Sequence, residues 1–201
     1  MPIEFKNSET KSNLIRSFAG ESMARNRYTF AASEAKKQKQ PVIEAVFTFT
    51  ANQEKEHAEI FYGLLKEMSG QNLEVCANYP VDVTDNLASL LSAARHNEYE
   101  EHDVIYKSFG EKAKEEGFTR IAAIYNMIAE IEKTHGQRFE ALYELVQQNK
   151  LFISDAECKW MCLNCGHIYT GKEAPEVCPV CEHARGYFIR LEFSPYNYNF
   201  S

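Results

Sequence analysis

Apolar residues along the first three quarters of the chain recur every three or four positions, the spacing of one face of an α-helix. Four such stripes occur between about residues 9 and 148. They run from Leu14 to Ala32, from Val46 to Met68, from Leu87 to Phe109 and from about Phe118 to Val146. Pro41 precedes the second stripe, where a first-turn proline is tolerated. The pattern predicts four helices around a shared core.

The lengths of the links between these helices predict their order in space. Short links join the first helix to the second and the third to the fourth, so each pair should be antiparallel neighbours. The segment from about 70 to 84 is longer, contains Pro80, and can cross the bundle from end to end. One long crossover is typical of ferritin-like folds. Residues 1–150 are therefore predicted to form a mainly α, ferritin-like four-helix bundle.

The end of the chain has a different composition. A breaker-rich stretch ends the helical pattern, and residues 151–157 are predicted to be a linker. Residues 158–201 then hold cysteines, glycines, prolines and aromatic rings. So short a segment rarely buries a sufficient core without a staple such as a metal ion. We expect a second, small metal domain there.

Charge and hydropathy narrow the range of partners. The net charge of -7 lies entirely in residues 1–157, because residues 158–201 hold four basic and four acidic residues. An acidic bundle lacks the clustered Lys and Arg that nucleic acid requires. No apolar run approaches the ~20 residues that span a bilayer, and the start of the chain has no signal-peptide pattern. We expect a cytoplasmic protein that binds neither nucleic acid nor membrane.

Acidic and imidazole side chains interrupt the apolar stripes on the inward face. They are Glu21, Glu54, His57, Glu98, Glu101, Glu132 and His135. Residues three apart share a helix face, so six of them project as three pairs, two of which are Glu-x-x-His. Five buried carboxylates would destabilise the bundle unless cations lay among them, and two divalent ions nearly balance their charge. Carboxylate and imidazole ligands favour iron or manganese over structural zinc.

A single Glu-x-x-His is weak evidence, since about one is expected by chance in this composition. Two on separate helices, in phase with Glu on the other two, match the ligand set of di-iron carboxylate bundles. His96 and His102 do not lie on the third apolar stripe and are expected on the surface. On the fourth stripe, Ile131 is expected to face inward. Tyr28 and Tyr106 are either packed tyrosines with satisfied hydroxyls or donors to a metal carboxylate or bound oxygen.

Four of the six cysteines form two Cys-x-x-Cys pairs, twelve residues apart: Cys162, Cys165, Cys178 and Cys181. This spacing is a strong metal-site signal, which zinc ribbons and one-iron sites share. Gly166 relieves the backbone after the first pair. Cys76 is expected to be a small hydrophobe in a loop, and Cys158 is most simply a non-ligand.

These motifs resemble those of rubrerythrins, in which a ferritin-like di-iron bundle precedes a rubredoxin-like domain. The likeness covers nearly the whole chain and rests on Glu21, Glu54-Lys-Glu-His57, Glu98-Tyr-Glu-Glu101, Glu132-Lys-Thr-His135 and the four cysteines. It implies two non-haem irons in the bundle and one iron on the four cysteines. One departure is His167, which follows the Cys-x-x-Cys-Gly motif where a tyrosine is more usual.

The resemblance also implies ligand roles: Glu54 and Glu132 as bridges, Glu21 on one iron, Glu98 and His135 on the other, and His57 and Glu101 as ligands of the first iron that exchange with its oxidation state. It implies reduction of hydrogen peroxide to water in an anaerobe or microaerophile, as oxidative stress defence. Electrons would come from NADH or NADPH through a reductase or rubredoxin. Such proteins are typically homodimers, in which the rubredoxin-like iron of one subunit serves the di-iron site of the other.

On this hypothesis Tyr28, Tyr106 and Glu101 are the expected catalytic residues, with protons relayed by a carboxylate or by Tyr106. Two alternatives remain from the sequence. One is a ferroxidase or iron-handling protein that uses the same bundle site. The other is a non-enzymatic helical dimer that carries a zinc ribbon for binding a partner.

Overall fold

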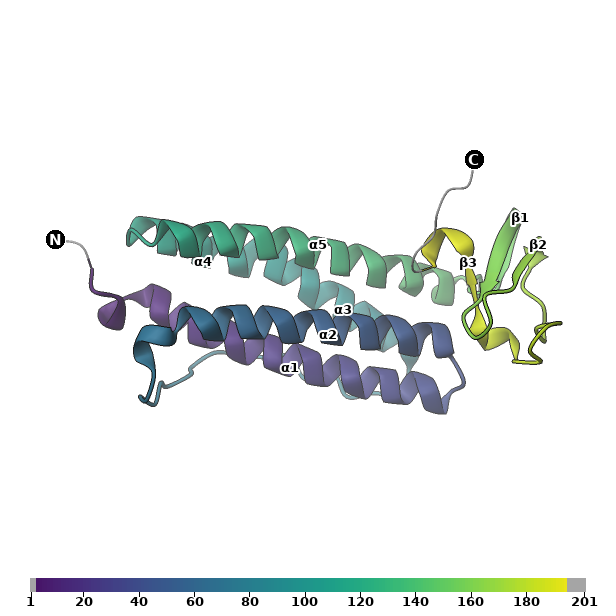
Figure 1. The fold of residues 1–201 in the computed structure, drawn as a ribbon, viewed down its shortest axis with the longest axis horizontal. Coiled ribbons are helices and arrows are strands. Elements are labelled where there is room, and N and C mark those ends of the chain that lie inside the picture. The colour runs from purple at the N-terminus through teal and green to yellow at the C-terminus, as the bar shows by residue number, and fades with distance from the viewer. Residues whose placement is uncertain (1–2, 195–201) are drawn as a thin grey trace.

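The computed structural model describes residues 3–194, and residues 1–2 and 195–201, at the outer ends of the two predicted domains, lie outside that part. Two helical hairpins pack side by side, with a small sheet at one end of the bundle (Figure 1). The first hairpin is α1 (Glu9–Lys37) and α2 (Pro41–Leu64). The second pairs α3 (Leu87–Glu100) and α4 (Tyr106–Glu115) with α5 (Thr119–Gln147). The predicted ferritin-like bundle is confirmed.

Local sequence sets where the first helices begin and end. The Ser8 hydroxyl oxygen accepts a hydrogen bond from the Lys11 backbone N–H and caps α1. Pro41 occupies the first turn of α2, as predicted. The second helix is shorter than its stripe, because Met68 lies in the 3₁₀ turn η2 (Lys66–Met68).

The third helix is not continuous, contrary to its unbroken stripe. A π-helical turn, η3 (Glu101–Ile105), separates α3 from α4. A π turn inserts an additional residue and so rotates the following side chains around the axis. His102, predicted on the surface, is buried: it follows the buried Glu98 by four residues, which places the two about 40° apart around a helix. Ile131 was wrongly placed inward: it is 38% exposed, because its neighbour Glu132, about 100° around α5, takes the inward position.

The crossover from Gln71 to Asn86 runs along the bundle without helix or strand, as predicted. It is tied to α1 by two hydrogen bonds. The Tyr79 hydroxyl donates to the Arg16 carbonyl (2.9 Å), and the Arg16 guanidinium donates to the Cys76 carbonyl (3.0 Å). The side chain of Cys76 is exposed rather than packed.

Two apolar clusters fill the bundle on either side of its middle. One contains Tyr28, Phe47 and Phe139, and the other contains Phe61 and Tyr125. Ring centroids are 5.1 Å apart both for Phe47 and Phe139 and for Phe61 and Tyr125. The layer between these clusters holds the buried carboxylates, which apolar packing thus shields from both ends. None of the helices described is long and apolar enough to cross a membrane.

The small domain is a three-stranded antiparallel sheet of order β2-β1-β3. Its strands are β1 (Ile153–Cys162), β2 (Ile168–Glu173) and β3 (Phe188–Arg190). Strand β1 begins within the predicted linker, because Ile153 pairs with Glu173. Trp160 and Phe188 are fully buried in a small core beside the cysteines.

Candidate metal centres

The inward carboxylates and histidines of the bundle converge in two overlapping groups. The first is Glu21, Glu54, His57 and Glu132, and the second is Glu54, Glu98, Glu132 and His135. Within each group the candidate ligand atoms lie within 4.8 Å of one another. All of these side chains are at most 5% exposed. The structure therefore brings together six of the seven predicted ligands, from α1, α2, α3 and α5.

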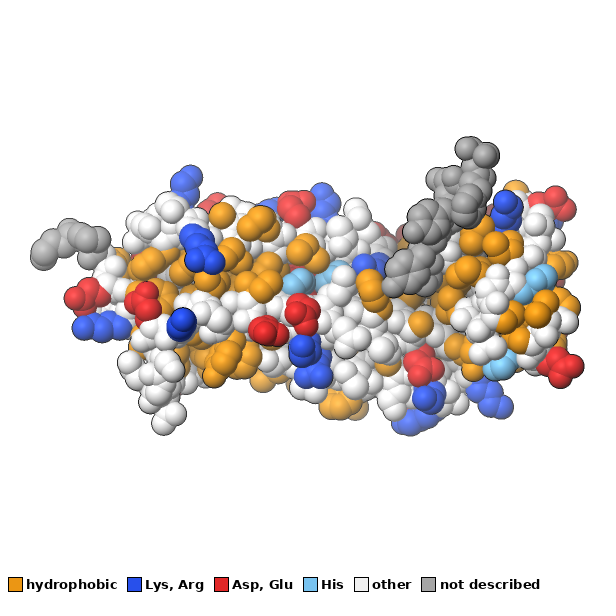
Figure 2. All heavy atoms as spheres, viewed as in Figure 1, with side chains coloured by type: hydrophobic (Ala, Val, Ile, Leu, Met, Phe, Trp, Pro, Cys, Tyr) orange, Lys and Arg blue, Asp and Glu red, His pale blue; other side chains and the backbone are white. Residues whose placement is uncertain are grey.

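The histidines point their Nδ1 atoms at the carboxylates. His57 Nδ1 lies 3.1 Å from Glu54 and 2.9 Å from Glu132. His135 Nδ1 lies 3.0 Å from Glu54, 2.9 Å from Glu132 and 3.5 Å from Glu98. The two rings stack with centroids 5.6 Å apart. On the face seen in Figure 2, histidine side chains are visible about midway along the bundle, between α2 and α5, although both ligand histidines are buried.

The donor atoms fit a pair of ions. Both carboxylate oxygens of Glu54 and of Glu132, and Nδ1 of both histidines, are buried without a hydrogen-bond partner among the described residues. Buried polar atoms are normally paired, so this concentration points to a missing ligand. Ligand atoms about 2.1 Å from one ion and at right angles lie about 3.0 Å apart. The observed spacings of 2.9–3.1 Å agree with that geometry.

Without bound ions, the pKa values of the carboxyl and imidazole groups in this site are strongly shifted. Burial, followed by the charges of neighbouring carboxylates, raises the pKa of Glu21 and of Glu98 well above the ordinary range. Burial lowers the pKa of the histidines, but close carboxylates outweigh it and raise the pKa to about 9 for His57 and about 12 for His135. Burial raises the pKa of Glu132, but both histidines outweigh it and lower the value to about 2.

Metal binding to the emptied bundle is expected to release protons and to become tighter as pH rises from 6 to 8. At neutral pH both His57 and His135 are protonated, since their pKa values lie above 7. A metal needs neutral imidazoles and ionised carboxylates, so at least about two protons must leave. Zinc calorimetry in two buffers with different ionisation enthalpies measures this number. A metal affinity that does not change with pH would contradict the protonated state of His57 and His135.

Both predicted tyrosines lie against the carboxylate layer. The Tyr106 hydroxyl donates to Glu21 Oε1 (2.5 Å), and the Tyr28 hydroxyl donates to Glu98 Oε1. Burial and nearby carboxylates raise the pKa of both phenols, so both remain protonated at neutral pH. Tyr106 of α4 therefore binds a member of the first ligand group, Glu21. Tyr28 of α1 binds a member of the second, Glu98.

Glu101 stands apart from the other predicted ligands. Among residues 3–194 it belongs to neither converging group. It is half-buried at the start of the π turn and lines a cavity of about 240 Å³ beneath the crossover. Burial and then the charges of Glu98, Glu132 and Glu54 raise its pKa, so Glu101 is electrostatically close to the site without joining it.

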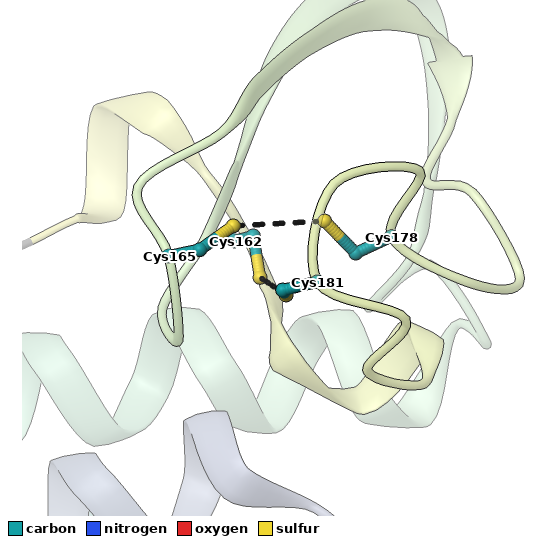
Figure 3. Close-up of side chains that lie close together, drawn as sticks. All are labelled: Cys162, Cys165, Cys178 and Cys181. Atoms are coloured by element: carbon teal, nitrogen blue, oxygen red, sulfur yellow. Dashed lines mark hydrogen bonds between the residues drawn. The ribbon is translucent and has the colours of Figure 1, made fainter.

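The four predicted cysteines meet in the small domain (Figure 3). Sγ of Cys162 and Cys181 are 3.7 Å apart, as are Sγ of Cys165 and Cys178. A disulfide requires about 2.05 Å, so these are free thiols. Tetrahedral coordination with bonds of about 2.3 Å places the sulfurs about 3.8 Å apart. The cluster fits a single tetrathiolate ion, and Cys158 on β1 lies outside it.

The first Cys-x-x-Cys turn is closed by two backbone hydrogen bonds. Gly166 N–H donates to the Cys162 carbonyl (2.8 Å), and Cys162 N–H donates to the His167 carbonyl (2.9 Å). Gly166 adopts φ +78°, a conformation that glycine reaches without strain. His167 takes part in this turn through its backbone carbonyl. A histidine supplies that carbonyl as well as the more usual tyrosine would.

The second turn repeats the same pattern with a different residue. Glu182 N–H donates to the Cys178 carbonyl (2.9 Å), and Cys178 N–H donates to the His183 carbonyl (2.8 Å). Glu182 has φ +61°, where a side chain is unfavourable. Sequence reasoning missed this position, although it follows the second Cys-x-x-Cys as Gly166 follows the first.

Replacing Glu182 with glycine is expected to stabilise the small domain by about 1 kcal/mol, because it removes the cost of the left-handed backbone. The matched change Gly166→Ala should destabilise it by a similar amount. Thermal unfolding and the rate of metal loss to a chelator measure both effects. If Glu182→Gly accelerates metal loss, the Glu182 side chain has a stabilising role that outweighs the cost of its left-handed backbone conformation.

The fold and the two clusters define a ferritin-like carboxylate bundle joined to a rubredoxin-like four-cysteine domain. The profile of the family described as Rubrerythrin matches residues 12–143, and that described as "Rubrerythrin, rubredoxin-like domain" matches residues 160–189. The chain belongs to the rubrerythrin family. Members are oxidoreductases, with a carboxylate and histidine di-iron site and a four-cysteine site for a third iron.

Relatives match over most of their length. Rubrerythrin of Porphyromonas gingivalis is 44% identical over 183 residues, covering 91% of this chain and 90% of the relative. Rubrerythrin of Clostridium perfringens is 44% identical over 185 residues, covering 91% and 94%. The structure of fully reduced, all-ferrous nigerythrin aligns with a TM-score of 0.61 at 28% identity, covering 92% of this chain and 90% of that chain. Dithionite-reduced symerythrin from Cyanophora paradoxa aligns with a TM-score of 0.60 at 22% identity, covering 73% and 89%, and shows the shared fold.

Proposed function

We propose that the chain is a peroxidase that reduces hydrogen peroxide to two waters, taking up two protons and two electrons. The observation that carries this proposal is the sharing of Glu54 and Glu132 by two ligand groups, in a chain that also holds a four-cysteine site. Shared carboxylates would let the two groups hold two ions close together, which would suit a two-electron reaction. The role would be oxidative stress defence in the cytoplasm of an anaerobe or microaerophile.

The ligand groups suggest how iron would be held. Glu54 and Glu132 would bridge the pair, and each remaining member of a group would serve one ion: Glu21 and His57 the first, Glu98 and His135 the second. Glu101 would exchange with His57 on the first ion. When bound, iron would supply the redox chemistry: two electrons for peroxide at the bundle site, and one-electron transfer from the donor at the four-cysteine site.

The protein's own groups would supply protons and exclude water. Tyr106 and Tyr28 hold protonated hydroxyls against carboxylates of the two groups, and Glu101 lines the cavity next to them. The apolar clusters on both sides keep the layer dry, which strengthens each of these interactions. We assign Tyr106 and Glu101 to proton relay and Tyr28 to the same task on the side of Glu98.

The position of the small domain supports a homodimer. The domain meets the bundle at its end, where Gly186 packs so closely that an added Cβ would lie 2.6 Å from the Lys39 carbonyl oxygen. From Pro41 to Glu54, α2 rises about 20 Å. Electrons within one chain would have to cover that distance. A second subunit that placed its small domain beside the middle of the bundle would shorten the path.

The test is stopped-flow mixing of the fully reduced protein with hydrogen peroxide. We expect oxidation of both iron centres within seconds, followed by steady turnover when NADH and a reductase or rubredoxin are supplied. Centres that stay reduced would exclude the proposal. Faster turnover with ferrous ion and oxygen than with peroxide would instead assign the bundle site to iron oxidation.

A further inference from the structure

A glycine lets α3 and α5 approach closely beside the second ligand group. Gly136 of α5 is buried, and a Cβ built on it would lie 2.9 Å from Cε1 and 3.0 Å from Cδ1 of the Tyr99 ring of α3. Real Cβ atoms essentially never come closer than 3.0 Å to another heavy atom. The Tyr99 ring therefore occupies the space that a side chain at position 136 would need.

The Tyr99 ring is also held at its far end. Its hydroxyl donates a hydrogen bond of 2.8 Å to Oε2 of Glu140, one turn after Gly136 on α5. Arg95, one turn before Tyr99 on α3, lies 3.7 Å from the other oxygen of Glu140. The Arg95 guanidinium also covers the Tyr143 ring, with its Cζ 4.9 Å from the centroid. Two side chains of α3 thus meet one carboxylate of α5, and the ring cannot swing away from Gly136 without losing the hydrogen bond.

Each partner in this contact is the chain neighbour of a candidate ligand. Tyr99 follows Glu98, and Gly136 follows His135. Glu98 Oε2 lies 3.5 Å from His135 Nδ1, and both side chains are at most 1% exposed. Both residues belong to the second ligand group and not to the first. A change in the spacing of α3 and α5 at this level would therefore move two donors of the second group apart, and would leave the two ligands that belong only to the first group, on α1 and α2, in place.

We infer that Tyr99 is a positioning residue, which packs on Gly136 and so sets the distance between Glu98 and His135. The inference rests on the proposed function, in which those two residues serve the second ion. A metal site needs its ligands held within about 0.5 Å of the productive geometry. Ordinary contact with a Cβ begins at 3.4 Å, which is 0.5 Å more than the 2.9 Å that the Tyr99 ring leaves. An alanine at position 136 would therefore displace the ring, or α3 with it, by as much as the site tolerates.

Zinc calorimetry tests the inference without peroxide chemistry. The full-length protein is used with zinc already in the four-cysteine site and the bundle emptied by a chelator. We expect Gly136→Ala to weaken one of the two bundle zinc ions about tenfold, as the loss of an outer partner does, and the other less than about twofold. Because alanine favours a helix more than glycine does, helix propensity cannot cause this loss.

Gly63→Ala is the matched control. Gly63 is an exposed residue of α2, and a Cβ on it would meet nothing within 4 Å. This change should leave the affinity for both bundle zinc ions within about twofold of the unaltered protein. An equal weakening in both glycine variants, or no weakening in Gly136→Ala, overturns the inference.

A double-mutant cycle shows whether Tyr99 carries the effect. Tyr99→Ala should weaken the same zinc ion about tenfold. Adding Gly136→Ala should then cost less than about a further twofold, because the ring that the new methyl group would displace is gone. Losses that add up to about a hundredfold overturn the inference. If Gly136→Ala does not fold, Tyr99→Leu, which lacks the ring and the hydroxyl, should still weaken this zinc ion about fivefold, and no loss there has the same meaning.

Glu98→Gln identifies the zinc ion that is affected. In that background the second position is already weakened, so Gly136→Ala should leave the remaining zinc ion within about twofold. A further loss would reveal a general disturbance of the bundle and overturns the inference. Two zinc ions of unaltered affinity in Glu98→Gln alone would refute the ligand assignment of the proposed function and the inference with it, whereas an ineffective Gly136→Ala refutes the inference alone. Since peroxide is not used, failure of the proposed peroxidase activity would leave these results unaffected.

Discussion

Replacing Glu132 with glutamine is expected to empty both metal positions of the bundle and to lower peroxide turnover more than ~100-fold. Glu132 is fully buried and contributes an oxygen to each ligand group. Its two oxygens lie 2.9 Å from His57 and 2.9 Å from His135, so one side chain orders both ends of the site. Losing even an outer partner of a metal ligand costs 10–100-fold in affinity, and the loss of a shared ligand should exceed that.

Two control substitutions show which of these effects are specific to Glu132. Glu98→Gln alters a member of one group only, so we expect it to weaken one metal position and to leave the other filled. Glu130→Gln alters an exposed residue on the same helix and should leave iron content and turnover within about twofold. Iron per chain and peroxide consumption are measured for all three. Two irons retained in the bundle of Glu132→Gln would refute the assignment of Glu132 as a shared ligand.

The bundle and most of its ligand set could be predicted from sequence because both follow one periodicity. The same 3.6-residue repeat that brings Phe61 and Phe139 into the core brings Glu54 and His135 into it. Polar residues on an apolar stripe are informative because their burial needs compensation. The ligands therefore stand out on each helix without knowledge of its neighbours.

Glu101 shows the limit of that reasoning. Its spacing from Glu98 places it inward on a regular α-helix, but a π turn begins at Glu101 itself. The turn packs against α5, a tertiary contact that no local sequence pattern reports. His102, in the same turn, is buried beside Glu130 on α5, with 3.4 Å between His102 Nε2 and a Glu130 oxygen. The surface position predicted for His102 was therefore wrong, whereas the role of Glu101 as an exchanging ligand stays a prediction.

The small domain could be predicted as a metal site but not as a sheet. The cysteine spacing depends on two local turns, so it is visible in the sequence. Strand β1 instead depends on pairing with β2 and β3, partners that lie up to about 30 residues away in the chain. The local composition around Ile153 therefore predicts a linker and does not indicate that Ile153 pairs with Glu173.

Replacing Cys178 with serine is expected to abolish steady-state peroxide turnover, by more than ~100-fold, while leaving a single turnover intact. Cys178 is fully buried and its Sγ lies 3.7 Å from that of Cys165. Besides cysteines, the buried core of the small domain is formed by Trp160, Ala174 and Phe188. Metal binding supplies about 10–16 kcal/mol in comparable small domains, so this domain should lose its order with its metal.

The separation of single from repeated turnover identifies the direction of electron flow. Protein whose bundle has been reduced chemically should consume its first equivalent of peroxide within about twofold of the unaltered rate, because the carboxylate layer is shielded by its own apolar clusters. Repeated turnover needs electrons from the donor, which on our proposal enter only through the cysteine site. Cys158→Ala, on β1 but outside the cluster, is the control and should change neither rate. Sustained turnover by Cys178→Ser would mean that electrons reach the bundle by another route, and the two metal centres would then be independent.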